Sequence, residues 1–551
     1  MSVRPLRQTE VPTETLGCME ADSSNALFKP LSLLLAEGGD SRLAIDRGTD
    51  ANVYGCRPRP APRTLAFSSS TATSISERAF RRAERARGEL IERSDEVGVL
   101  EAFDRQVERM RNSLRSCLEL DGIDIVFSPS GTDTQLHALY FARLLLGGPV
   151  TSIVVASDQT GSGTAYTSRG QNFSNLTAQG KFVEKGTPIP GLADGVHSLG
   201  ISMFAQDGAI RPASEIDAAV IDAVAGQIRL GRKVVLQTMD SSKLGWRAPS
   251  DGCLREIGAR WPQQVQIVVD ACQLRTSRAR IRDFLDRGFI VLVTGSKFFT
   301  GPAFSGASLF PAPLADRIAA WTSSPEGLAE YATRFDLPIR WNSARAVLPA
   351  TPNFGQWLRW EAALEEMRAY YALPASFRLS ALGRLAEAVP ALIASSRHLQ
   401  LMAGQDVPAS MLDDGEMAYR TIFPFFVERN GRALDFDDLT KIYRALNRDL
   451  GAALASDATD EDRTLASVPC HIGQPVKLPG AGGGKAVLRI GIGARLLSEC
   501  WSTDTLTAEA NIAAAIENIA AVVRKLDLIV RTGIYEAPAC VTPVELRARV
   551  V

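Results

Sequence analysis

The sequence has few of the residues that metal sites, disulfide frameworks and membrane spans require. Its four histidines show no metal-ligand spacing, and its eight cysteines are scattered without a CxxC pair. Scattered single cysteines are typical of reduced thiols in a cytoplasmic protein. No apolar run approaches the length of a membrane span, and the first residues lack the apolar core of a signal peptide. We therefore expect a cytoplasmic protein with no metal and no membrane partner.

An excess of charge of one sign is also absent. The formal net charge is −1 at pH 7, with 22% charged and 45% hydrophobic residues. A balanced charge gives no electrostatic attraction for a polyanion, so we expect no nucleic-acid partner. The 551 residues are enough for two or three domains with large cores.

Two short apolar runs, Val265–Val269 and Phe289–Val293, each end in polar residues. Short runs rich in Val and Ile are typical of buried parallel strands, and ligands bind beyond the carboxyl ends of such strands. Asp270 follows the first run and Lys297 follows the second, so we expect both to face one crevice. Pyridoxal phosphate needs a lysine for its Schiff base and an acid for its pyridine nitrogen. On this pair alone, a surface Asp and Lys that close two strands are an equal alternative.

A third polar turn lies upstream. The predicted strand Ile123–Phe127 leads through Ser130, Gly131 and Thr132 into a predicted helix at Thr134–Leu146. A glycine lets the backbone approach a phosphate, and a helix N-terminus offers free N–H groups and a positive dipole. The alternative is a plain helix cap by Ser or Thr. Its place before Asp270 and Lys297 favours the phosphate site.

These motifs resemble those of fold-type-I pyridoxal phosphate enzymes of the class V aminotransferase and cysteine desulfurase family. Asp270-Ala271-Cys272-Gln273 resembles their Asp-x-x-Gln, and Thr294-Gly295-Ser296-Lys297 resembles their Ser-x-His-Lys. Leu348–Gly355 is similar to their Gly-Thr-Pro-Asn segment, and Leu488–Gly493 to their Leu-Arg-x-Ser-x-Gly. The features span residues from about 120 to about 500 in the order of that family.

The resemblance implies an α/β, aspartate-aminotransferase-like fold, with a three-layer large domain on a mainly parallel sheet and a smaller C-terminal α+β domain. We expect an irregular N-terminal arm over residues 1–90, the cofactor-binding domain over 91–350 and the smaller domain over 351–551. Helical periodicity in the last part predicts helices over residues 357–370, 375–389, 392–401, 436–450 and 507–528.

The resemblance also implies roles for these residues. Lys297 forms the internal aldimine and then acts as general acid and base, Asp270 keeps the pyridinium protonated, and Gln273 bonds the phenolic oxygen. Thr351 reaches the phosphate of the other subunit, which implies an obligate homodimer with shared active sites. The expected cofactor-binding set is Ser130, Gly131, Thr132, Asp270, Gln273, Thr294, Ser296, Lys297 and Thr351.

The substrate side carries a weaker match. Arg489 corresponds to the family's clamp for the substrate α-carboxylate, a task that suits the planar fork of a guanidinium. The alternative is an arginine on an edge strand in solvent. One of Asp240, Ser241 or Ser242 should approach the phenolic oxygen or the substrate, and we place Ser241 in the substrate site. A surface turn is an equal alternative there.

Two departures from the family leave the reaction type open. Thr160 and Gly161 stand where desulfurases carry a Glu-His pair whose His stacks on the cofactor ring. Either a neighbour such as Tyr166 supplies a ring, or the face at Gly161 is open for a bulky or second substrate. Ile472 stands where one desulfurase branch has its nucleophilic Cys, and Cys470 falls two residues early.

The resemblance implies a transferase or lyase that acts on an α-amino acid through an external aldimine. Amino-group transfer is our first choice. The second is a lyase or synthase that uses the same carbanion, by C–S or C–C bond cleavage or formation, β- or γ-substitution, or decarboxylation. The third is an inert homologue that binds cofactor, against which the retained Lys297 argues.

Overall fold

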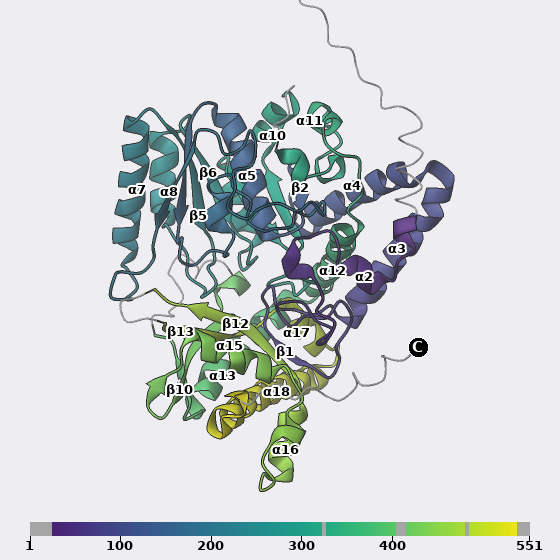
Figure 1. Ribbon diagram of the computed structural model, residues 1–551, viewed down its shortest axis with the longest axis vertical. Helices are drawn as coiled ribbons and strands as arrows, with labels where there is room; N and C mark the ends of the chain where they lie inside the picture. The colour runs from purple at the N-terminus through teal and green to yellow at the C-terminus, as the bar shows by residue number, and fades with distance from the viewer. Residues whose placement is uncertain (1–24, 322–326, 404–414, 480–483, 537–551) are drawn as a thin grey trace, which may run out of the picture.

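The computed structural model describes residues 25–321, 327–403, 415–479 and 484–536. Their strands form two sheets, which occupy the upper and lower halves of Figure 1 and are both flanked by helices.

The larger sheet has seven strands in the order β2-β8-β7-β6-β5-β3-β4. Strand β8 runs antiparallel to both of its neighbours, and the other pairs are parallel. The strands are β2 (Asp124–Ser128), β3 (Val150–Val155), β4 (Val196–Ile201), β5 (Lys233–Met239), β6 (Val265–Asp270), β7 (Ile290–Thr294) and β8 (Gly306–Phe310).

Both faces of this sheet are covered, which explains why its strands are apolar throughout. Ile290 and Leu292 of β7 belong to the core cluster that includes α5 (Gly131–Leu146). Val291 and Val293 belong to the cluster on the opposite face. That face packs against α7 (Ala213–Arg229), α8 (Asp251–Arg260) and α9 (Arg278–Asp286). The expected α/β fold with a three-layer, mainly parallel sheet is confirmed.

The second sheet has the order β1-β12-β13-β10-β11, with β9 paired to β10. Its first strand comes from the N-terminal arm and runs parallel to β12, with Phe67 opposite Ile472. The strands are β1 (Leu65–Phe67), β9 (Leu399–Leu401), β10 (Ile422–Arg429), β11 (Arg432–Ala433), β12 (Cys470–Lys477) and β13 (Ala486–Gly491). The helices of this half are α13 (Ala375–Ser395), α15 (Phe436–Leu446), α16 (Asp460–Ser467), α17 (Ala494–Cys500) and α18 (Thr505–Thr532).

A third group of helices lies beside the two sheets, on the right of Figure 1. It comprises α2 (Leu31–Leu35), α3 (Glu77–Val97), α4 (Val99–Leu118) and α12 (Phe354–Tyr371). Arg359 of α12 is 1% exposed and donates hydrogen bonds to the carbonyls of Leu35, Glu37 and Gly38. A cation that satisfies several buried carbonyls is a strong anchor, so the arm is held in place here. The short helices are α6 (Thr164–Thr167), α10 (Ala312–Ala319) and α11 (Asn342–Ala346).

The helix predicted over residues 392–401 is wrong in its second half. The chain leaves α13 at Ser395, and Leu399–Leu401 forms β9 on the edge of β10. Ser396 turns the chain, because its hydroxyl oxygen accepts the backbone N–H groups of His398 and Leu399. Side-chain capping of this kind is invisible to a count of apolar spacing.

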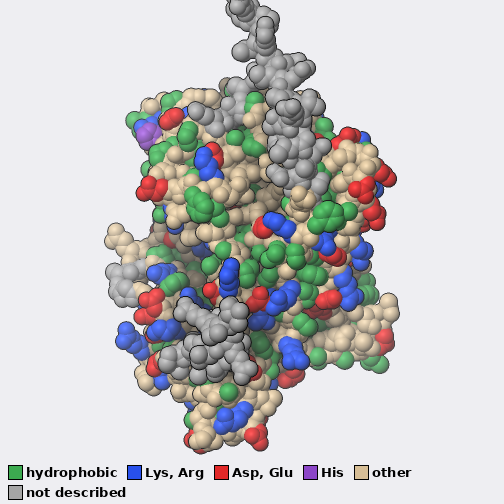
Figure 2. All heavy atoms as spheres, turned by 45° about the vertical axis from the view of Figure 1, so that its right-hand side comes forward, with side chains coloured by type: hydrophobic (Ala, Val, Ile, Leu, Met, Phe, Trp, Pro, Cys, Tyr) green, Lys and Arg blue, Asp and Glu red, His purple; other side chains and the backbone are tan. Residues whose placement is uncertain are grey.

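The surface carries charge of both signs. Figure 2 shows Lys and Arg side chains scattered among Asp and Glu over one face, with apolar side chains between them. Among the described residues, no helix combines the length and the apolar character that a bilayer span needs.

Candidate active site

A cavity of about 380 Å³ lies where the carboxyl ends of β5, β6 and β7 meet the N-terminal arm and the second sheet. This volume is in the range of small-molecule sites. Of the twelve residues expected at the site, eleven line this cavity, and Thr351 does not. The eleven are Ser130, Gly131, Thr132, Gly161, Ser241, Asp270, Gln273, Thr294, Ser296, Lys297 and Arg489.

Asp270 ends β6, and its carboxylate is held by two donors. Gln135 Nε2 donates to Oδ2 at 2.9 Å, and the Cys272 backbone N–H donates to Oδ1 at 3.0 Å. The amide oxygen of Gln135 accepts in turn from Thr164 Oγ1 at 2.7 Å and Thr167 Oγ1 at 3.3 Å. The orientation of the Gln135 amide is thereby fixed, so its N–H must point to Asp270. Sequence reasoning missed Gln135 because it lies in the middle of an ordinary helix.

Lys297 follows β7, the parallel neighbour of β6 in the sheet. Its backbone carbonyl accepts from Ser69 Oγ at 3.2 Å and from the Thr300 N–H at 3.0 Å, which fixes the turn. No acceptor among the described residues lies within hydrogen-bond distance of its amine. The amine is thus available to a ligand in the cavity.

Gln273 and Ser296 line the cavity beside these two residues. The side-chain oxygen of Gln273 accepts from Arg275 Nη1 at 3.1 Å, which leaves its N–H groups for a ligand. Thr294 uses its hydroxyl to donate to the Cys272 carbonyl at 2.7 Å, so it ties the ends of β6 and β7 together.

The start of α5 closes one end of the cavity. Ser130 Oγ accepts the backbone N–H groups of Thr132 and Asp133 at 3.1 and 3.3 Å, and donates to Asp133 Oδ2 at 2.5 Å. Burial raises the pKa of Asp133 to about 7. A Cβ on Gly131 would lie 3.2 Å from both Cys272 Sγ and Thr294 Cγ2. A glycine therefore suits the tight packing of the helix start against Cys272 and Thr294. The approach of a phosphate to this backbone stays a prediction.

Arg42 of the N-terminal arm faces this helix start. Its Nη2 lies 3.4 Å from Ser130 Oγ and 3.3 Å from Thr132 Oγ1, and its Nε donates to Asp40 Oδ1 at 2.8 Å. The guanidinium also lies 4.8 Å from the centre of the Phe304 ring. A cation at a helix N-terminus strengthens an anion site. Sequence reasoning took the arm as irregular and missed Arg42, since no motif marks it.

Arg489 of β13 lines the cavity and is 5% exposed. Its guanidinium donates to the Gln474 carbonyl at 3.2 Å, to Gln474 Oε1 at 3.2 Å and to the Lys243 carbonyl at 2.9 Å. Burial lowers its pKa to about 10. The expectation that Arg489 reaches the site fits this position, and the solvent-exposed alternative is excluded.

The turn after β5 contributes Ser241 and Lys243 to the lining. Asp240 is instead paired with Arg247 and Arg280, at 3.1 and 3.2 Å. Of the three residues considered in this turn, Ser241 is the one that faces the cavity. Lys243 was missed, although it stands two residues after Ser241.

The segment after β3 brings Gln159, Thr160, Gly161 and Ser162 to the cavity without a ring. Tyr166 is not among the described residues that line it, and its ring packs instead under the Lys185 ammonium at 4.8 Å. Tyr166 is therefore not placed to supply the ring. The aromatic residues that do line the cavity are Tyr54, Phe304 and Phe436.

Cys470 does not line the cavity. Its Sγ lies 3.4 Å from the Val468 carbonyl, and burial raises the pKa of the thiol to about 11. Cys272 does line the cavity, but burial raises its pKa well above the usual value. Neither thiol is set up as a thiolate nucleophile.

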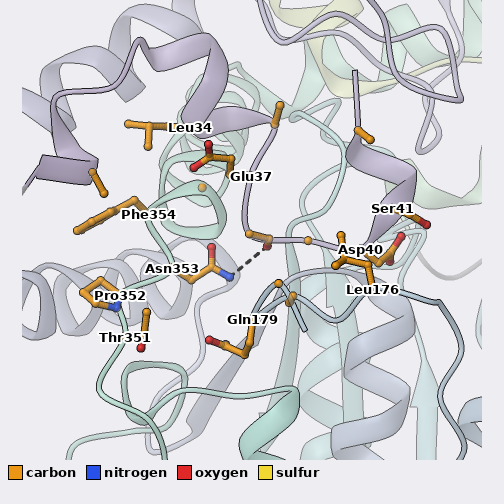
Figure 3. Close-up of a pocket in the computed structure, with 18 residues that line it drawn as sticks. Leu34, Glu37, Asp40, Ser41, Leu176, Gln179, Thr351, Pro352, Asn353 and Phe354 are labelled. Carbon is orange, nitrogen blue, oxygen red and sulfur yellow. Dashed lines mark hydrogen bonds between the residues drawn. The ribbon is translucent and has the colours of Figure 1, made fainter. Parts of the chain in front are cut away.

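Thr351 is exposed and lines a second cavity of about 500 Å³ (Figure 3). Nearby, Asn353 Nδ2 donates to the carbonyl of Gly38 at 3.1 Å. The residue thus lies away from the cofactor site of its own chain, and its assignment to a partner's phosphate stays a prediction. Among the described residues, no group of three His, Cys, Asp or Glu side chains is placed to hold a metal ion.

Neither family models nor curated proteins match the sequence. Solved structures are similar at low identity. Alanine–glyoxylate aminotransferase from Nostoc sp. has a TM-score of 0.46 at 13% identity, over 86% of this chain and 99% of that one. Phosphoserine aminotransferase from Cytophaga hutchinsonii has 0.44 at 12%, over 83% and 99%. A structure of Oryza sativa TDC with PLP and tryptamine has 0.45 at 12%, over 95% and 90%. Identities this low do not determine the reaction of this chain.

Proposed function

We propose that this chain is a pyridoxal-phosphate-dependent enzyme that acts on an α-amino acid. The observation that carries the proposal is the pairing of Lys297 and Asp270 in one cavity, at the ends of adjacent parallel strands. The start of α5, which suits an anion, and Arg489 line the same cavity.

The residues fit the cofactor at each of its functional groups. Gly131 leaves room that a Cβ would fill, and Thr132, Ser296 and Arg42 offer donors to the phosphate. Ser130, whose hydroxyl donates to Asp133, caps the start of the helix beside them. A helix N-terminus and a guanidinium together suit a doubly charged anion. When bound, the cofactor supplies an electron sink for charge that develops at the substrate's α-carbon.

Asp270 holds the proton on the pyridine nitrogen in this proposal. Both of its oxygens accept a hydrogen bond, so the carboxylate is held in one orientation. A carboxylate in this position would stabilise a protonated ring nitrogen of the cofactor. Gln135 keeps the carboxylate oriented, so we regard it as a positioning residue.

Lys297 would hold the cofactor through its amine. The same amine would move the proton at the substrate's α-carbon. Arg489 orients the substrate by binding its carboxylate, and its hydrogen bonds to Gln474 and to the backbone of Lys243 hold the guanidinium in position.

Amino-group transfer is the reaction that we propose first. The open face at Gly161 supports a second candidate, a lyase or synthase in which a second small molecule meets the activated α-carbon. The residues that line the cavity from this segment, Thr160, Gly161 and Ser162, carry no ring that would limit access to this face.

We further propose a homodimer in which Thr351 binds the phosphate in the partner's site. Its exposed position, away from the cavity of its own chain, supports a role across an interface. Light scattering should give twice the chain mass, and Thr351→Ala should weaken cofactor affinity. A monomer that binds cofactor as tightly as the dimer would refute this arrangement.

The test of the proposed function is an absorbance spectrum of the purified protein with pyridoxal phosphate, before and after a panel of amino acids is added. We expect a visible band that is lost in Lys297→Ala and kept in Lys243→Ala, the matched variant of the second lysine in the cavity. Borohydride reduction and peptide mass spectrometry should place the adduct on Lys297. Conversion to a pyridoxamine spectrum supports amino-group transfer. A protein that takes up no cofactor would refute the proposal.

A further inference from the structure

Lys243 is a second amine in the cavity that the proposed chemistry does not use. It stands in the turn after β5, lines the cavity and is partly buried. No acceptor among the described residues lies within hydrogen-bond distance of its ammonium. A buried ammonium without a partner is costly, so such a group calls for a ligand.

Lys243 lies at the same end of the cavity as Arg489. The Arg489 guanidinium donates to the Lys243 carbonyl at 2.9 Å, and its other bonds go to the neutral oxygens of Gln474. No carboxylate pairs with either cation among the described ion pairs. Two unpaired cations thus face the substrate end together.

The pKa of Lys243 reflects this excess of positive charge. Burial, and to a lesser extent the nearby charges of Arg489 and Lys297, together lower its pKa to about 8, against a smaller opposing effect of Asp158. The carboxylate of Asp158 is engaged elsewhere, by the Ser202 hydroxyl at 2.5 Å and the Met203 N–H at 3.3 Å. An anion bound beside Lys243 would relieve both the desolvation and the repulsion.

Charge balance then indicates the kind of anion, given the proposed function on which this step rests. Asp270 would face the ring nitrogen, the start of α5 and Arg42, which is also ion-paired with Asp40, would face the phosphate, and Arg489 would bind the α-carboxylate of the substrate. The ammonium of Lys243 then has no anion assigned to it. A neutral side chain on the substrate would leave this ammonium without an anionic partner.

We propose that the substrate is an amino acid whose side chain ends in an acidic group, and that Lys243 binds this group. Carboxylate, sulfonate and phosphate share the required chemistry, since each offers charged oxygen acceptors to an ammonium. Lys243 is thus a specificity-determining residue, beside the carboxylate clamp of Arg489.

The experiment measures binding of amino acids to the cofactor-loaded protein, by the change in cofactor absorbance and by the shift of the thermal midpoint. Each acidic ligand is paired with its neutral counterpart: L-glutamate with L-glutamine, L-aspartate with L-asparagine, and L-phosphoserine with L-serine. The pairs also distinguish a carboxylate from a phosphate. The variants are Lys243→Met, the charge-retaining Lys243→Arg, and Lys233→Met as the control. Lys233 starts β5, at the end of the strand that is away from the cavity.

In the native protein and in Lys233→Met, we expect at least one acidic ligand to bind tenfold or more tightly than its counterpart. Lys243→Met should lose this preference while it keeps its affinity for the neutral ligand, and Lys243→Arg should retain part of the preference. Equal binding of both members of every pair would overturn the proposal and leave the proposed function standing. A second result would also overturn the proposal and leave the proposed function standing. In that result, Lys243→Met shifts the cofactor band before any ligand is added, and the preference for acidic ligands persists. Lys243 would then bind the cofactor and not the substrate. A protein that binds cofactor but no amino acid would overturn both proposals.

Discussion

Gln135 and Asp270 are joined by a hydrogen bond of 2.9 Å between two elements that the sequence keeps 135 residues apart. The amide oxygen of Gln135 is already taken by Thr164 and Thr167, so the side chain cannot flip without breaking these contacts. The contact therefore fixes the position of the carboxylate that we propose as the partner of the cofactor's ring nitrogen.

We predict that Gln135→Leu weakens the affinity for pyridoxal phosphate about tenfold or more, because a hydrogen bond to a charged group is worth about 1.5–3 kcal/mol. Gln135→Glu should weaken it further, since a second carboxylate beside Asp270 favours the protonated acid. Absorbance titration with the cofactor gives both affinities. Thr167→Val removes only the longer of the two bonds to the Gln135 oxygen and is the matched control, with little expected change. Unchanged affinity in Gln135→Glu would contradict the role given to this contact.

Arg42 offers a second prediction, which concerns the phosphate alone. Arg42→Met should weaken the binding of pyridoxal phosphate about tenfold or more and leave the binding of pyridoxal, which lacks the phosphate, unchanged. The quantity to measure is the ratio of the two dissociation constants. Arg47→Met, an exposed substitution in the same arm, is the control and should leave the ratio as in the native protein. A parallel loss of both affinities would mean that Arg42 only supports the fold of the arm.

The sequence was informative wherever function depends on strand ends. Asp270 and Lys297 each follow a short apolar run, and parallel strands bring the carboxyl ends of such runs together at one edge of a sheet. Arg489 lies in an antiparallel strand of the second sheet, and only the resemblance to the family motif pointed to it. The three-layer fold follows from the same runs, since strands that are apolar on both faces must be covered on both faces.

The sequence did not reveal the site residues that are placed by contacts between distant segments, because such contacts leave no local sequence pattern. Arg42 reaches the cavity because Arg359, more than 300 positions away, binds the carbonyls of the arm at Leu35, Glu37 and Gly38. The sequence around Lys243 is also typical of a surface turn. In the structure, Arg489 of the second sheet packs against this turn and donates to the Lys243 carbonyl. Neither residue belongs to a recognisable sequence motif, and only the packing of distant segments makes them part of a site.

The lowered pKa of Lys243 leads to a pH prediction. A lysine with a pKa of about 8 is charged below that pH and neutral above it, and it faces Arg489, Lys297 and Asp158. The preference for an acidic over a neutral amino acid should therefore be full near pH 7 and fall up to tenfold per unit above about pH 8. Comparing the two ligands cancels the titration of their shared α-amino group. Lys243→Arg should move the fall to higher pH, and a preference that stays constant from pH 7 to pH 9.5 would contradict the assignment.

The last prediction concerns His471, which ties the arm to the second sheet. Its Nε2 lies 2.8 Å from the carbonyl oxygen of Tyr54, a residue that lines the cavity, and burial lowers its pKa from 6.5 to about 4. The folded protein thus takes up this proton less readily than the unfolded chain. Stability from the neutral imidazole is complete above pH 6.5 and is lost as the pH falls towards 4, by about 1.4 kcal/mol per unit.

Urea unfolding at pH 7, 6 and 5 measures this loss, and His471→Asn should show a smaller decrease in the free energy of unfolding over that range than the native protein. His197→Asn is the control, because His197 is exposed and its replacement should leave the decrease unchanged. His137, whose pKa burial also lowers to about 4, contributes equally to all three proteins and cancels in the comparison. His471→Asn should also bind pyridoxal phosphate less tightly, because the arm that carries Tyr54 and Arg42 loses one of its anchors. Equal pH dependence in the native protein and His471→Asn would show that this histidine does not hold the arm as a neutral group.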